Sequence, residues 1–312
     1  MSTRDIAVGL LIDDRERVLI GQRLENTDFA GWWEFPGGKF EAGESVQQAL
    51  ARELQEELGI IVRSSEPLIT LDWAYPNKRV RLHTRLIRRW SGTPRSCEGQ
   101  AIDWRPIAAL ENARLLPANR IIVNALRLPD RYCITPDPAD FDSTSCFLDQ
   151  VSATLDTGIR LLRLRAHSLD DVAYCHLAGQ VAALCQQSRA DLIIDRNPEM
   201  MRSIGAAGLH LTRHALRRSR RRPVPQGCWL SVSCHDPQEL ALAESVGADF
   251  CVLSPVRRSE HHPGRVGWRQ FSRWVAETPM PVYALGGMQA EDIAISRRHG
   301  GQGIAAVRSL WV

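Results

Sequence analysis

The chain has 312 residues, more than one hydrophobic core usually holds, so two domains are expected. A net charge of +3 with 24% charged residues indicates a globular protein without a strong nucleic-acid signal, and its apolar runs are too short to span a membrane. The eight cysteines are scattered and form no Cys-x-x-Cys pair, which favours reduced thiols in packed positions and a cytoplasmic protein.

Two short apolar runs open the chain. Ile6–Ile12 and Val18–Gln22 flank the polar turn Asp13–Arg17, a pattern that predicts a hairpin-like pair of strands. Arg23 follows the second run. An arginine there either stays on the surface or faces a pocket shared with the loop that leads to Trp33.

The turn Pro36-Gly37-Gly38 comes next, and Lys39 follows it directly. Glycine has no side chain, so the backbone here can approach a metal ion or a phosphate closely. Lys39 is either an exposed cation or a charge that faces the phosphates and favours departure of pyrophosphate.

A helix of roughly 14 residues is predicted between Ser45 and Gly59. Ser45 with Gln48 three residues later is a capping-box pattern, and Gly59 suits the left-handed position that ends a helix. An apolar stripe that can pack on a sheet consists of Val46, Leu50, Leu54 and Leu58.

Glu53, Glu56 and Glu57 fall within one arc of the same helix, beside the apolar stripe. Three glutamates on a helix face are often no more than a solvated surface. Carboxylates held this close repel one another, however, and a cation among them removes that repulsion. Hard oxygen ligands suit Mg²⁺ or Mn²⁺, which share their remaining coordination positions with water and substrate phosphates.

The whole stretch resembles the signature of the Nudix hydrolases. With x for any residue, its fixed positions read Gly38-x5-Glu44-x7-Arg52-Glu53-Leu54-x-Glu56-Glu57-x-Gly59-Ile60. The resemblance implies an α/β/α sandwich with a mixed sheet, whose loop-helix-loop binds a divalent metal and hydrolyses a nucleoside diphosphate linked to another group. The implied metal ligands are Glu53, Glu56 and Glu57, one of them also the base for water, with the carbonyl of Gly37 or Gly38. Arg52 would hold the carboxylates in place, and Glu44 would support the loop.

Beyond the helix, Pro67–Trp73 and Val80–Trp90 are predicted strands joined by a turn at Pro76-Asn77. A loop with Glu98-Gly99-Gln100 then leads to the strand-like Asp103–Pro106. This loop and strand resemble the Nudix branch of MutT-type 8-oxo-dGTP diphosphatases, in which a carboxylate from this region joins the metal site. The resemblance gives that part to Glu98.

Asn119 lies in the segment Leu116-Pro117-Ala118-Asn119, ahead of the apolar helix-like stretch Ile121–Leu126. Taken alone, such an asparagine is commonly a helix N-cap. Its amide also pairs a donor with an acceptor and can read a purine edge, the part that the same branch resemblance implies. The implied substrate-binding residues are Arg23, Glu34, Phe35, Pro36, Gly37 and Asn119. Asp28 departs from the branch, which often has a histidine there, and an ionised acid cannot donate a hydrogen bond to the base.

A short break at Leu128-Pro129-Asp130 divides the chain, and we expect domains at 1–128 and 131–312. In the second part, eight candidate strands alternate with helical or turn-rich segments. This pattern predicts a compact (β/α)8 TIM-type barrel with its active face at the carboxyl ends of the strands. The candidate strands are Tyr132–Thr135, Ile159–Leu164, Leu192–Asp195, Gly208–Leu211, Cys228–Ser233, Phe250–Leu253, Pro281–Leu285 and Gly303–Val307.

Several segments of this part resemble thiamine-phosphate synthase and its TenI-like relatives. They are Leu164-Arg165, Ile194-Asp195-Arg196, Gly205–Leu211, Ser231–His235, Ser254-Pro255, His262-Pro263-Gly264, Ala284–Gly287 and Gly303–Val307. The synthases carry an acid and a lysine after Leu164-Arg165, where this chain has Ala166-His167, and Thr212–Ala215 replaces an expected acid. A metal and diphosphate site without these groups should bind poorly, so the synthase reaction itself is not favoured.

The glycine pair Gly286-Gly287 and the strand end at Arg308-Ser309 match the phosphate site that follows strands seven and eight of many such barrels. A phosphate ester is therefore a candidate ligand of the barrel. Three residues, Leu310, Trp311 and Val312, follow the eighth strand, so we expect the last barrel helix to be missing. We expect the apolar side it leaves to be covered by the first domain or by another subunit of a homo-oligomer.

The basic run Arg217–Arg222 is either a solvated loop or a nucleic-acid contact, and no binding motif accompanies it. For the whole chain, the leading hypothesis is Mg²⁺-dependent hydrolysis of 8-oxo-dGTP to 8-oxo-dGMP and pyrophosphate, a step of nucleotide-pool sanitation that protects DNA from mutation. One alternative keeps this chemistry but changes the substrate to a diphosphate of thiamine metabolism. Another gives the barrel a synthase-like activity or a non-catalytic phosphate-binding part.

Overall fold

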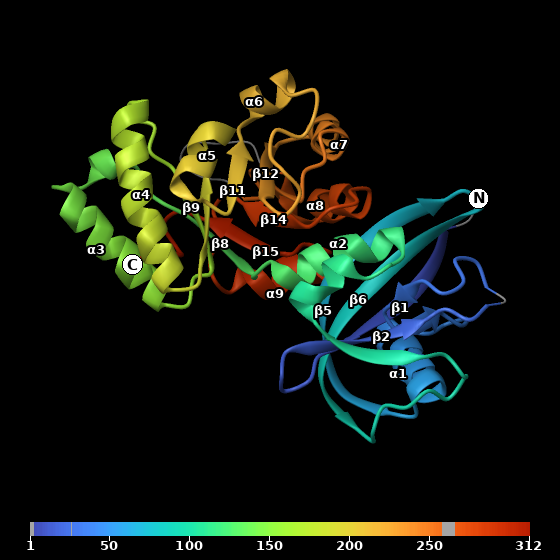
Figure 1. Ribbon diagram of the computed structural model, residues 1–312. Helices are drawn as coiled ribbons and strands as arrows, with labels where there is room; N and C mark the ends of the chain where they lie inside the picture. The colour runs from blue at the N-terminus through green and yellow to red at the C-terminus, as the bar shows by residue number, and fades with distance from the viewer. Residues whose placement is uncertain (1–2, 26, 258–265) are drawn as a thin grey trace. The chain divides into compact units, whose positions relative to one another are not determined.

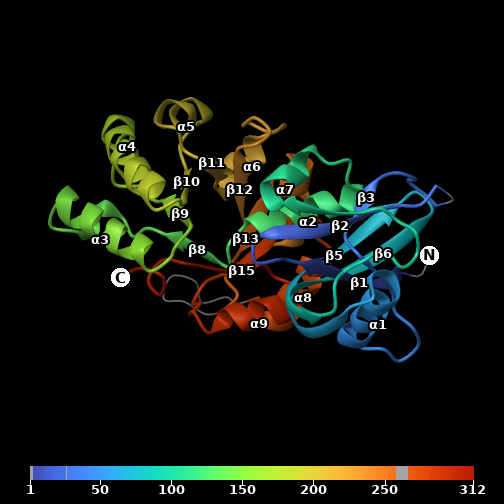
Figure 2. The ribbon, with the colours of Figure 1, turned by 60° about the horizontal axis from the view of Figure 1, so that its bottom comes forward.

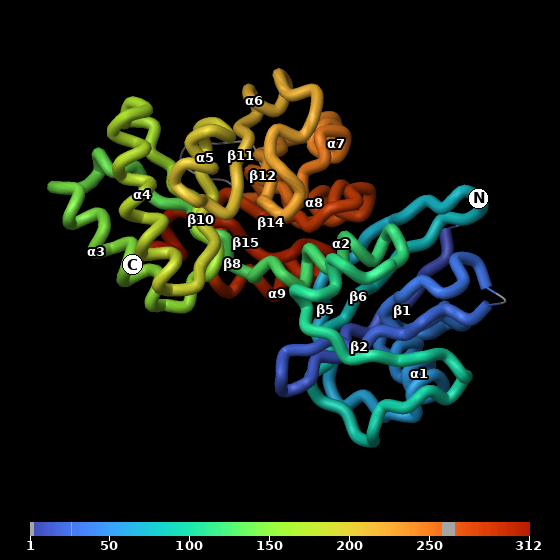
Figure 3. Tube along the Cα trace, in the orientation of Figure 1, coloured from blue at the N-terminus to red at the C-terminus, as the bar shows by residue number. Residues whose placement is uncertain are grey.

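The computed structural model describes residues 3–25, 27–257 and 266–312. The chain forms two compact units, and Figures 1 and 3 trace it through both. One unit consists of Met1–Arg127 with Val275–Pro279, and the other of Leu128–Trp274 with Met280–Val312. Within the described residues, no helix has the length and apolar character needed to cross a membrane.

The first unit holds two sheets. β1 (Thr3–Leu11) lies inside a four-stranded sheet of order β4-β1-β6-β5, parallel to β6 and antiparallel to β4. The smaller sheet has the order β3-β2-β7. The remaining strands are β2 (Arg17–Gln22), β3 (Trp33–Glu34), β4 (Gly37–Lys39), β5 (Ile61–Tyr75), β6 (Lys78–Ser91) and β7 (Ile102–Pro106). The mixed sheet confirms the fold class expected for this part of the chain.

The expected hairpin between the first two strands is wrong. β1 and β2 share one isolated bridge, between Ile12 and Val18, and then enter different sheets. The physical reason is that both edges of β1 are already occupied, by β4 on one side and by β6 along its whole length on the other. This pairing matters for the site, because it brings the glycines of β4 against β1.

Helix α1 spans Val46–Leu58 and confirms the predicted helix. Ser45 accepts a hydrogen bond from the Gln48 N–H, the Gln48 side chain bonds back to Ser45, and Gly59 ends the helix with φ 68°. Leu50 and Leu54 are buried against β1 and its neighbours. Burial of each such leucine stabilises the unit by about 2 kcal/mol, which fixes the rotation of the helix and thereby the direction of its glutamates.

Helix α2 (Pro117–Arg127) follows the short helix η1 (Ile107–Asn112). It begins at Pro117, whose ring presets the helical φ angle at a first-turn position. Asn119 therefore lies inside the first turn and is buried, so its interpretation as an N-cap is wrong. The Asn119 side chain therefore does not cap the helix and is available for another contact.

The second unit is a closed barrel of eight parallel strands, which confirms the predicted architecture. Each strand agrees with its prediction to within two residues at either end. The strands are β8 (Arg131–Ile134), β9 (Leu161–Leu164), β10 (Asp191–Ile194), β11 (Gly208–Leu211), β12 (Trp229–Cys234), β13 (Phe250–Leu253), β14 (Val282–Leu285) and β15 (Gly303–Ala306).

Helices connect these strands and lie outside the ring of strands (Figure 2). They are η2 (Pro138–Asp140), α3 (Thr144–Asp156), α4 (Asp171–Gln187), α5 (Pro198–Ile204), α6 (Arg213–Arg218), α7 (Pro237–Ser245), α8 (Gly267–Ala276) and α9 (Asp292–Arg298). Among the described residues no helix follows β15; instead, the Trp311 ring stacks on Phe147 at 5.8 Å and its N–H donates to Gln150 at 2.8 Å. What else covers this side of the barrel stays a prediction.

Aromatic side chains fill the floor of the barrel. The rings of Tyr132, Phe250 and Tyr283 lie 5.5 to 5.6 Å apart, centroid to centroid, and Trp229 packs on Phe250 at 5.9 Å. These four side chains belong to one buried cluster with Leu161. The barrel is therefore closed at this level, and any ligand site must lie above it, toward the carboxyl ends of the strands.

Two expectations about side-chain placement need correction. The eight cysteines are free, but Cys97 is exposed and not packed. The basic run is not a plain solvated loop, since Arg217 belongs to α6 and donates to Glu239 at 3.1 Å, and Arg222 pairs with Asp249 at 2.7 Å. These ion pairs tie parts of the run to the barrel.

Candidate active site

The glycine turn before α1 sets the geometry of the site. β4 pairs Gly37 with Val8 and Gly38 with Ala7 of β1. Gly37 has φ 139°, and a Cβ there would lie 2.1 Å from the carbonyl oxygen of Ala7. A Cβ at Gly38 would lie 2.1 Å from the carboxyl carbon of Glu53. Gly37 requires glycine, because its φ is positive and β4 lies directly against the backbone of β1. At Gly38 a Cβ would displace the Glu53 carboxylate, which is the far end of a flexible side chain.

Arg52 organises the carboxylates on one side of this helix. Its Nε and Nη2 donate to the two carboxylate oxygens of Glu44, each at 2.9 Å. Its Nη1 donates to Glu53 at 2.9 Å and to Glu56 at 3.2 Å, while Nη2 also reaches the carbonyl oxygen of Lys39 at 2.9 Å. The hydrogen bonds from Arg52 lower the pKa of Glu44 to about 2. One guanidinium thus links the loop to the helix.

Glu57 lies toward the glycine turn, where it accepts a hydrogen bond from the Gly37 N–H at 3.0 Å. Burial raises the pKa of Glu57 to about 8; the charges of Glu98, Glu34 and Glu53 act in the same direction, and the Gly37 hydrogen bond opposes them. The carboxyl therefore lies in a region of negative potential. A cation placed here would favour the ionised carboxylate and so lower this pKa.

The donor set fits a hard divalent cation. Carboxylates of Glu53, Glu56, Glu57 and Glu98 and a carbonyl of the glycine turn are the oxygen donors that Mg²⁺ and Mn²⁺ prefer. In the part of the chain that the structure describes, no three such side chains are yet gathered closely enough to hold an ion. Glu53 and Glu56 instead contact Arg52, and their side chains are 16% and 54% exposed. To bind a metal ion together, both would have to turn from Arg52.

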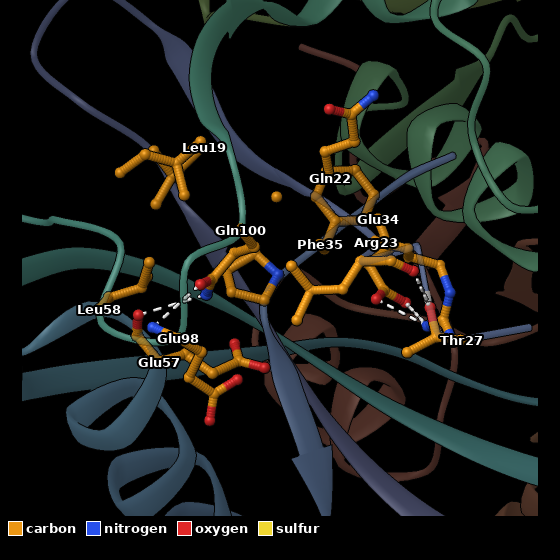
Figure 4. Close-up of a pocket in the computed structure, with 14 residues that line it drawn as sticks. Leu19, Gln22, Arg23, Thr27, Glu34, Phe35, Glu57, Leu58, Glu98 and Gln100 are labelled. Carbon is orange, nitrogen blue, oxygen red and sulfur yellow. Dashed lines mark hydrogen bonds and ion pairs between the residues drawn. The ribbon is translucent and has the colours of Figure 1, made fainter. Parts of the chain in front are cut away.

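A pocket opens beside Glu57 (Figure 4). Figure 4 shows Glu57 and Glu98 together at one end and Arg23 with Glu34 at the other. Gln100 supports the acidic end, because its Nε2 donates to the carbonyl oxygen of Glu57 at 3.3 Å. Carboxylates suited to a metal and an ion pair suited to hold a substrate thus line one pocket.

Arg23 forms the wall opposite the acids. Its Nη1 donates to both carboxylate oxygens of Glu34, at 2.7 and 2.8 Å, and its Nε donates to the carbonyl oxygen of Asp28 at 2.6 Å. Burial raises the pKa of Glu34, although Arg23 opposes this shift. The Arg23 side chain is 20% exposed. Of the two interpretations open from sequence, the structure supports the pocket-facing one.

A second cavity shares Arg23, Glu34 and Phe35 with the first. Asn119 lines it, and its Nδ2 is buried without a hydrogen-bond partner among the described residues. An amide left in this state costs about 1–3 kcal/mol unless water or a ligand satisfies it. The structure therefore brings Asn119 together with Arg23 and Phe35, around a donor that is ready for a ligand.

Sequence reasoning missed Tyr75 and Lys78, which line the same cavity as Asn119. The Lys78 Nζ lies 3.2 Å from Asp28 Oδ2 and 5.5 Å from the centre of the Tyr75 ring. Asp28, the departure noted in the sequence, is therefore an acceptor for a neighbouring lysine. The Pro76-Asn77 turn predicted that these two residues are close to each other, but nothing local indicates which loop they face.

Two other predicted site residues have definite places. Pro36 is buried, lines the first pocket and accepts the Gly9 N–H at 2.8 Å through its carbonyl. Lys39 has an exposed side chain and is not among the residues that line either cavity. Of its two interpretations, the structure places Lys39 as an exposed cation whose backbone, through Arg52, supports the loop.

The barrel holds a cavity of about 890 Å³ at the carboxyl ends of its strands. Its lining brings together the four residues predicted to hold a phosphate, which are Gly286, Gly287, Arg308 and Ser309. Gly286 has φ 99°, and a Cβ there would lie 2.9 Å from Pro255, so this position requires glycine. The Ser309 hydroxyl donates to the carbonyl oxygen of Met288 at 2.7 Å, joining the loops after β14 and β15. His262, Pro263 and Gly264 lie outside the described residues.

Comparison with known proteins divides the chain in the same place. Residues 3–126 match the model of the Nudix domain, and residues 131–310 match that of thiamine monophosphate synthase. The first part is 38% identical over 121 residues to an 8-oxo-dGTP diphosphatase of Haemophilus influenzae, covering 39% of this chain and 89% of that protein. It is 37% identical over 119 residues to a CTP pyrophosphohydrolase of Escherichia coli, covering 38% and 87%. The second part is 28% identical over 190 residues to a thiamine-phosphate synthase of Thioalkalivibrio sulfidiphilus, covering 59% and 89%.

Proposed function

The chain belongs to the Nudix family through its first part and to the thiamine monophosphate synthase family through its second, and we propose that the first part hydrolyses 8-oxo-dGTP to 8-oxo-dGMP and pyrophosphate. The observation that carries this proposal is the buried Asn119 Nδ2, which has no partner among the described residues. It lies in a cavity that shares Arg23 and Phe35 with the pocket of Glu57. A purine that satisfies this amide leaves its phosphates near the acids.

The chemistry is displacement at phosphorus. A water oxygen forms a bond to one phosphorus of the anhydride while the bond from that phosphorus to the leaving oxygen breaks. Bound at this site, Mg²⁺ would offset charge on the phosphate chain and lower the pKa of the attacking water. The residues that would hold it are Glu53, Glu56, Glu57, Glu98 and a carbonyl of Gly37 or Gly38.

Glu57 is our assignment for the group that accepts the proton of the water. Glu53 and Glu56 both receive hydrogen bonds from Arg52, whereas Glu57 receives one from the Gly37 N–H. That N–H fixes one carboxylate oxygen and leaves the other for a proton. Arg52 acts as a positioning residue, because it links the helix to Glu44 and to the carbonyl of Lys39.

Recognition of the base rests on three residues. Phe35, 4% exposed, offers an apolar surface to the ring. Asn119 offers a donor and an acceptor to one edge, and Arg23 is held in place by Glu34. An 8-oxopurine carries more hydrogen-bonding atoms on its imidazole side than guanine does, so these polar groups have more to contact. In this proposal, the enzyme removes an oxidised nucleotide from the cytoplasmic nucleotide pool.

A second candidate is hydrolysis of CTP by the same residues. The first part of the chain is 37% identical to a protein named CTP pyrophosphohydrolase and 38% identical to one named 8-oxo-dGTP diphosphatase. Sequence identity therefore favours CTP as a substrate nearly as much as 8-oxo-dGTP. A pyrimidine is smaller than a purine, so it would reach Asn119 less readily from the three residues that the two cavities share, Arg23, Glu34 and Phe35. A diphosphate of thiamine metabolism is a third substrate for the same chemistry, suggested by the family of the barrel.

The test is steady-state kinetics of the full chain with Mg²⁺ on 8-oxo-dGTP, dGTP, CTP and thiamine diphosphate. We expect the highest kcat/KM for 8-oxo-dGTP. Asn119→Ala should lower that value by roughly 10- to 100-fold, as expected for lost hydrogen bonds of a buried amide, and change the value for thiamine diphosphate little. Asn124→Ala, on the same helix and outside the cavity lining, is the matched control. A higher value for CTP, with equal effects of Asn119→Ala on every substrate, would refute the purine assignment.

A further inference from the structure

The loop between β6 and β7 carries Glu98, the carboxylate of the candidate metal site that does not belong to α1. A helix holds its own glutamates in place, whereas a carboxylate on a loop must be ordered at a cost in conformational entropy. Figure 4 nevertheless shows Glu98 beside Glu57, at the same end of the pocket. The contacts of the loop must therefore supply what the helix supplies to its own acids.

The loop is attached to the C-terminal end of α1. The last carbonyls of a helix receive no N–H from within the helix, so they need partners from elsewhere. The Arg95 N–H donates to the carbonyl oxygen of Leu58 at 3.1 Å, and the Cys97 N–H donates to that of Glu57 at 3.0 Å. Glu57 thus holds the loop through its main chain and also lines the pocket.

The side chain of Gln100 adds a second link, and it uses both ends of its amide. Its Nε2 donates to the carbonyl oxygen of Glu57 at 3.3 Å. Its Oε1 accepts the Glu98 N–H at 3.2 Å and the Ser96 hydroxyl at 3.0 Å. Gly99, with φ 87°, lies between the two linked residues of the loop. An amide suits this place, because a carboxylate lacks the donor and an ammonium group lacks the acceptor.

We infer that Gln100 is a positioning residue of the metal site, which holds Glu98 beside Glu57 so that both carboxylates reach one divalent cation. Gln100 acts through Glu98 and is not itself a ligand. The inference rests on the proposed function, since it takes the acids of this pocket as the metal site. Partners that orient a metal ligand set the affinity for the metal, and their loss typically weakens it by about 10- to 100-fold.

The first measurement is calorimetric titration of the nucleotide-free full chain with Mn²⁺, which accepts the same oxygen ligands as Mg²⁺. The signal of this site is the part of the heat that Glu57→Gln removes. Gln100→Ala should weaken the affinity by roughly tenfold or more. Gln55→Ala is the matched control, because Gln55 is an exposed residue of α1 outside the pocket lining. Its affinity for Mn²⁺ should stay within twofold of that of the unmodified chain.

A double-mutant cycle shows whether Gln100 acts through Glu98. Glu98→Gln should weaken Mn²⁺ binding by itself. In that background Gln100→Ala should change the affinity by less than about twofold, because the carboxylate that Gln100 positions is gone. If the two losses multiply instead, Gln100 acts independently of Glu98 and the inference is overturned.

Kinetics separate positioning from general damage to the fold. In Gln100→Ala the Mg²⁺ concentration that gives half of the maximal rate should rise by roughly tenfold. The KM for 8-oxo-dGTP and the kcat, both at saturating Mg²⁺, should stay within about threefold of the unmodified chain. A kcat that stays low at every Mg²⁺ concentration would mean that Gln100 supports the fold and not the metal site.

If Gln100→Ala fails to fold, as circular dichroism would reveal, Gln100→Met is the second variant. Methionine fills a similar space without the amide, and it should weaken Mn²⁺ binding to a similar extent. Unchanged Mn²⁺ affinity in a folded variant would overturn the inference and leave the proposed reaction intact. If Mn²⁺ affinity depends on Gln100 through Glu98 while no nucleoside triphosphate is hydrolysed, the proposed reaction fails and this inference stands.

Discussion

The two candidate phosphate sites of this chain carry opposite charges. In the Nudix unit the pocket presents Glu57, Glu98 and Glu34, and burial among acids raises the pKa of Glu57 to about 8. In the barrel, three arginines line the cavity with two aspartates, Asp137 and Asp140, so its charged lining is positive by one. The arginines are Arg163, Arg165 and Arg308. We expect a polyphosphate to need an added cation at the first site, whereas the second already contains arginines.

A protein can therefore bind phosphate groups in two different ways. A site built from carboxylates gains an ion with open coordination positions, which suits a reaction at phosphorus. A site built from arginines holds an anion by fixed hydrogen bonds and supplies no position for an activated water. We therefore expect catalysis in the first unit to depend on metal and pH, and binding in the barrel to depend on neither within the neutral range.

The largest expected effect is that of Glu57→Gln on hydrolysis. The amide keeps the shape of the carboxyl but cannot accept a proton from water or carry charge to a metal. We expect kcat for 8-oxo-dGTP to fall by roughly 10²- to 10⁴-fold, the range for loss of a general base. Initial rates at saturating Mg²⁺ measure it, and Glu53→Gln should be similarly damaging.

The matched control is Glu16→Gln, since Glu16 is an exposed partner of Arg88 outside the pocket. Its activity should stay within twofold of the unmodified chain. If Glu57→Gln kept more than a tenth of the activity, the contrast between a catalytic acidic site and a binding site would lose its main support.

The second effect is the pH dependence of Mg²⁺ binding. A carboxyl whose pKa is raised is protonated and neutral below that pKa, and a metal ligand must be deprotonated. Mg²⁺ affinity of the nucleotide-free chain should therefore rise with pH, by up to about tenfold per unit, and level off above pH 8. Calorimetry at pH 6, 7, 8 and 9 in two buffers of different ionisation enthalpy reports both the affinity and the proton released.

Glu57→Gln should flatten this pH dependence, because the group that loses the proton is gone. Mg²⁺ affinity that is constant from pH 6 to 8 would mean that Glu57 does not exchange a proton for the metal.

The third effect concerns the glycine of β4 that lies against β1. Gly37→Ala puts a Cβ 2.1 Å from the carbonyl oxygen of Ala7, at a φ of 139°, so the paired backbones of β4 and β1 must shift. We expect the free energy of unfolding of the first unit to fall by about 1–3 kcal/mol and hydrolysis to fall with it. Urea titration measures the first and initial rates the second. Gly43→Ala is the control: it has φ 84° but no atom within 4 Å of the added Cβ, so it should cost roughly 1 kcal/mol through backbone strain alone.

Elements with local signals could be predicted from the sequence. The capping box at Ser45, the left-handed Gly59 and the apolar stripe through Leu54 define α1 within the chain itself, and the helix has these limits. The barrel strands are short apolar runs between polar segments, and they too formed where expected. The acids of α1 could be predicted because a helix fixes their relative positions before any tertiary contact forms.

Features that depend on distant partners could not be predicted. Ile6–Ile12 is a strand by its pattern, but its pairing with β6 and β4 is decided by segments far along the chain, so the hairpin prediction failed. Lys78 meets Asp28 across fifty residues. Arg163 lies in the run Leu161–Leu164, where every position is buried and no alternation shows which side chains face inward. The pairing of β9 with β10 places Arg163 beside Asp195, which directly follows β10.

The smallest expected effect is Gly179→Ala, which tests whether the two regions are energetically separate. Gly179 is exposed within α4 of the barrel, and an added Cβ meets no atom within 4 Å. Alanine favours a helix over glycine by about 0.5–1 kcal/mol, which corresponds to a rise of roughly 1–4 °C in Tm for a unit of this size. Calorimetric melting with and without Mg²⁺ separates the outcomes. The first outcome is two transitions, with Gly179→Ala raising the Tm of one and Mg²⁺ raising the Tm of the other. It would show that the acidic and the arginine sites belong to units that unfold independently. A single transition that responds to both changes would instead mean that the stability of the Nudix site depends on the barrel, and the contrast between the sites would then describe two halves of one cooperative unit.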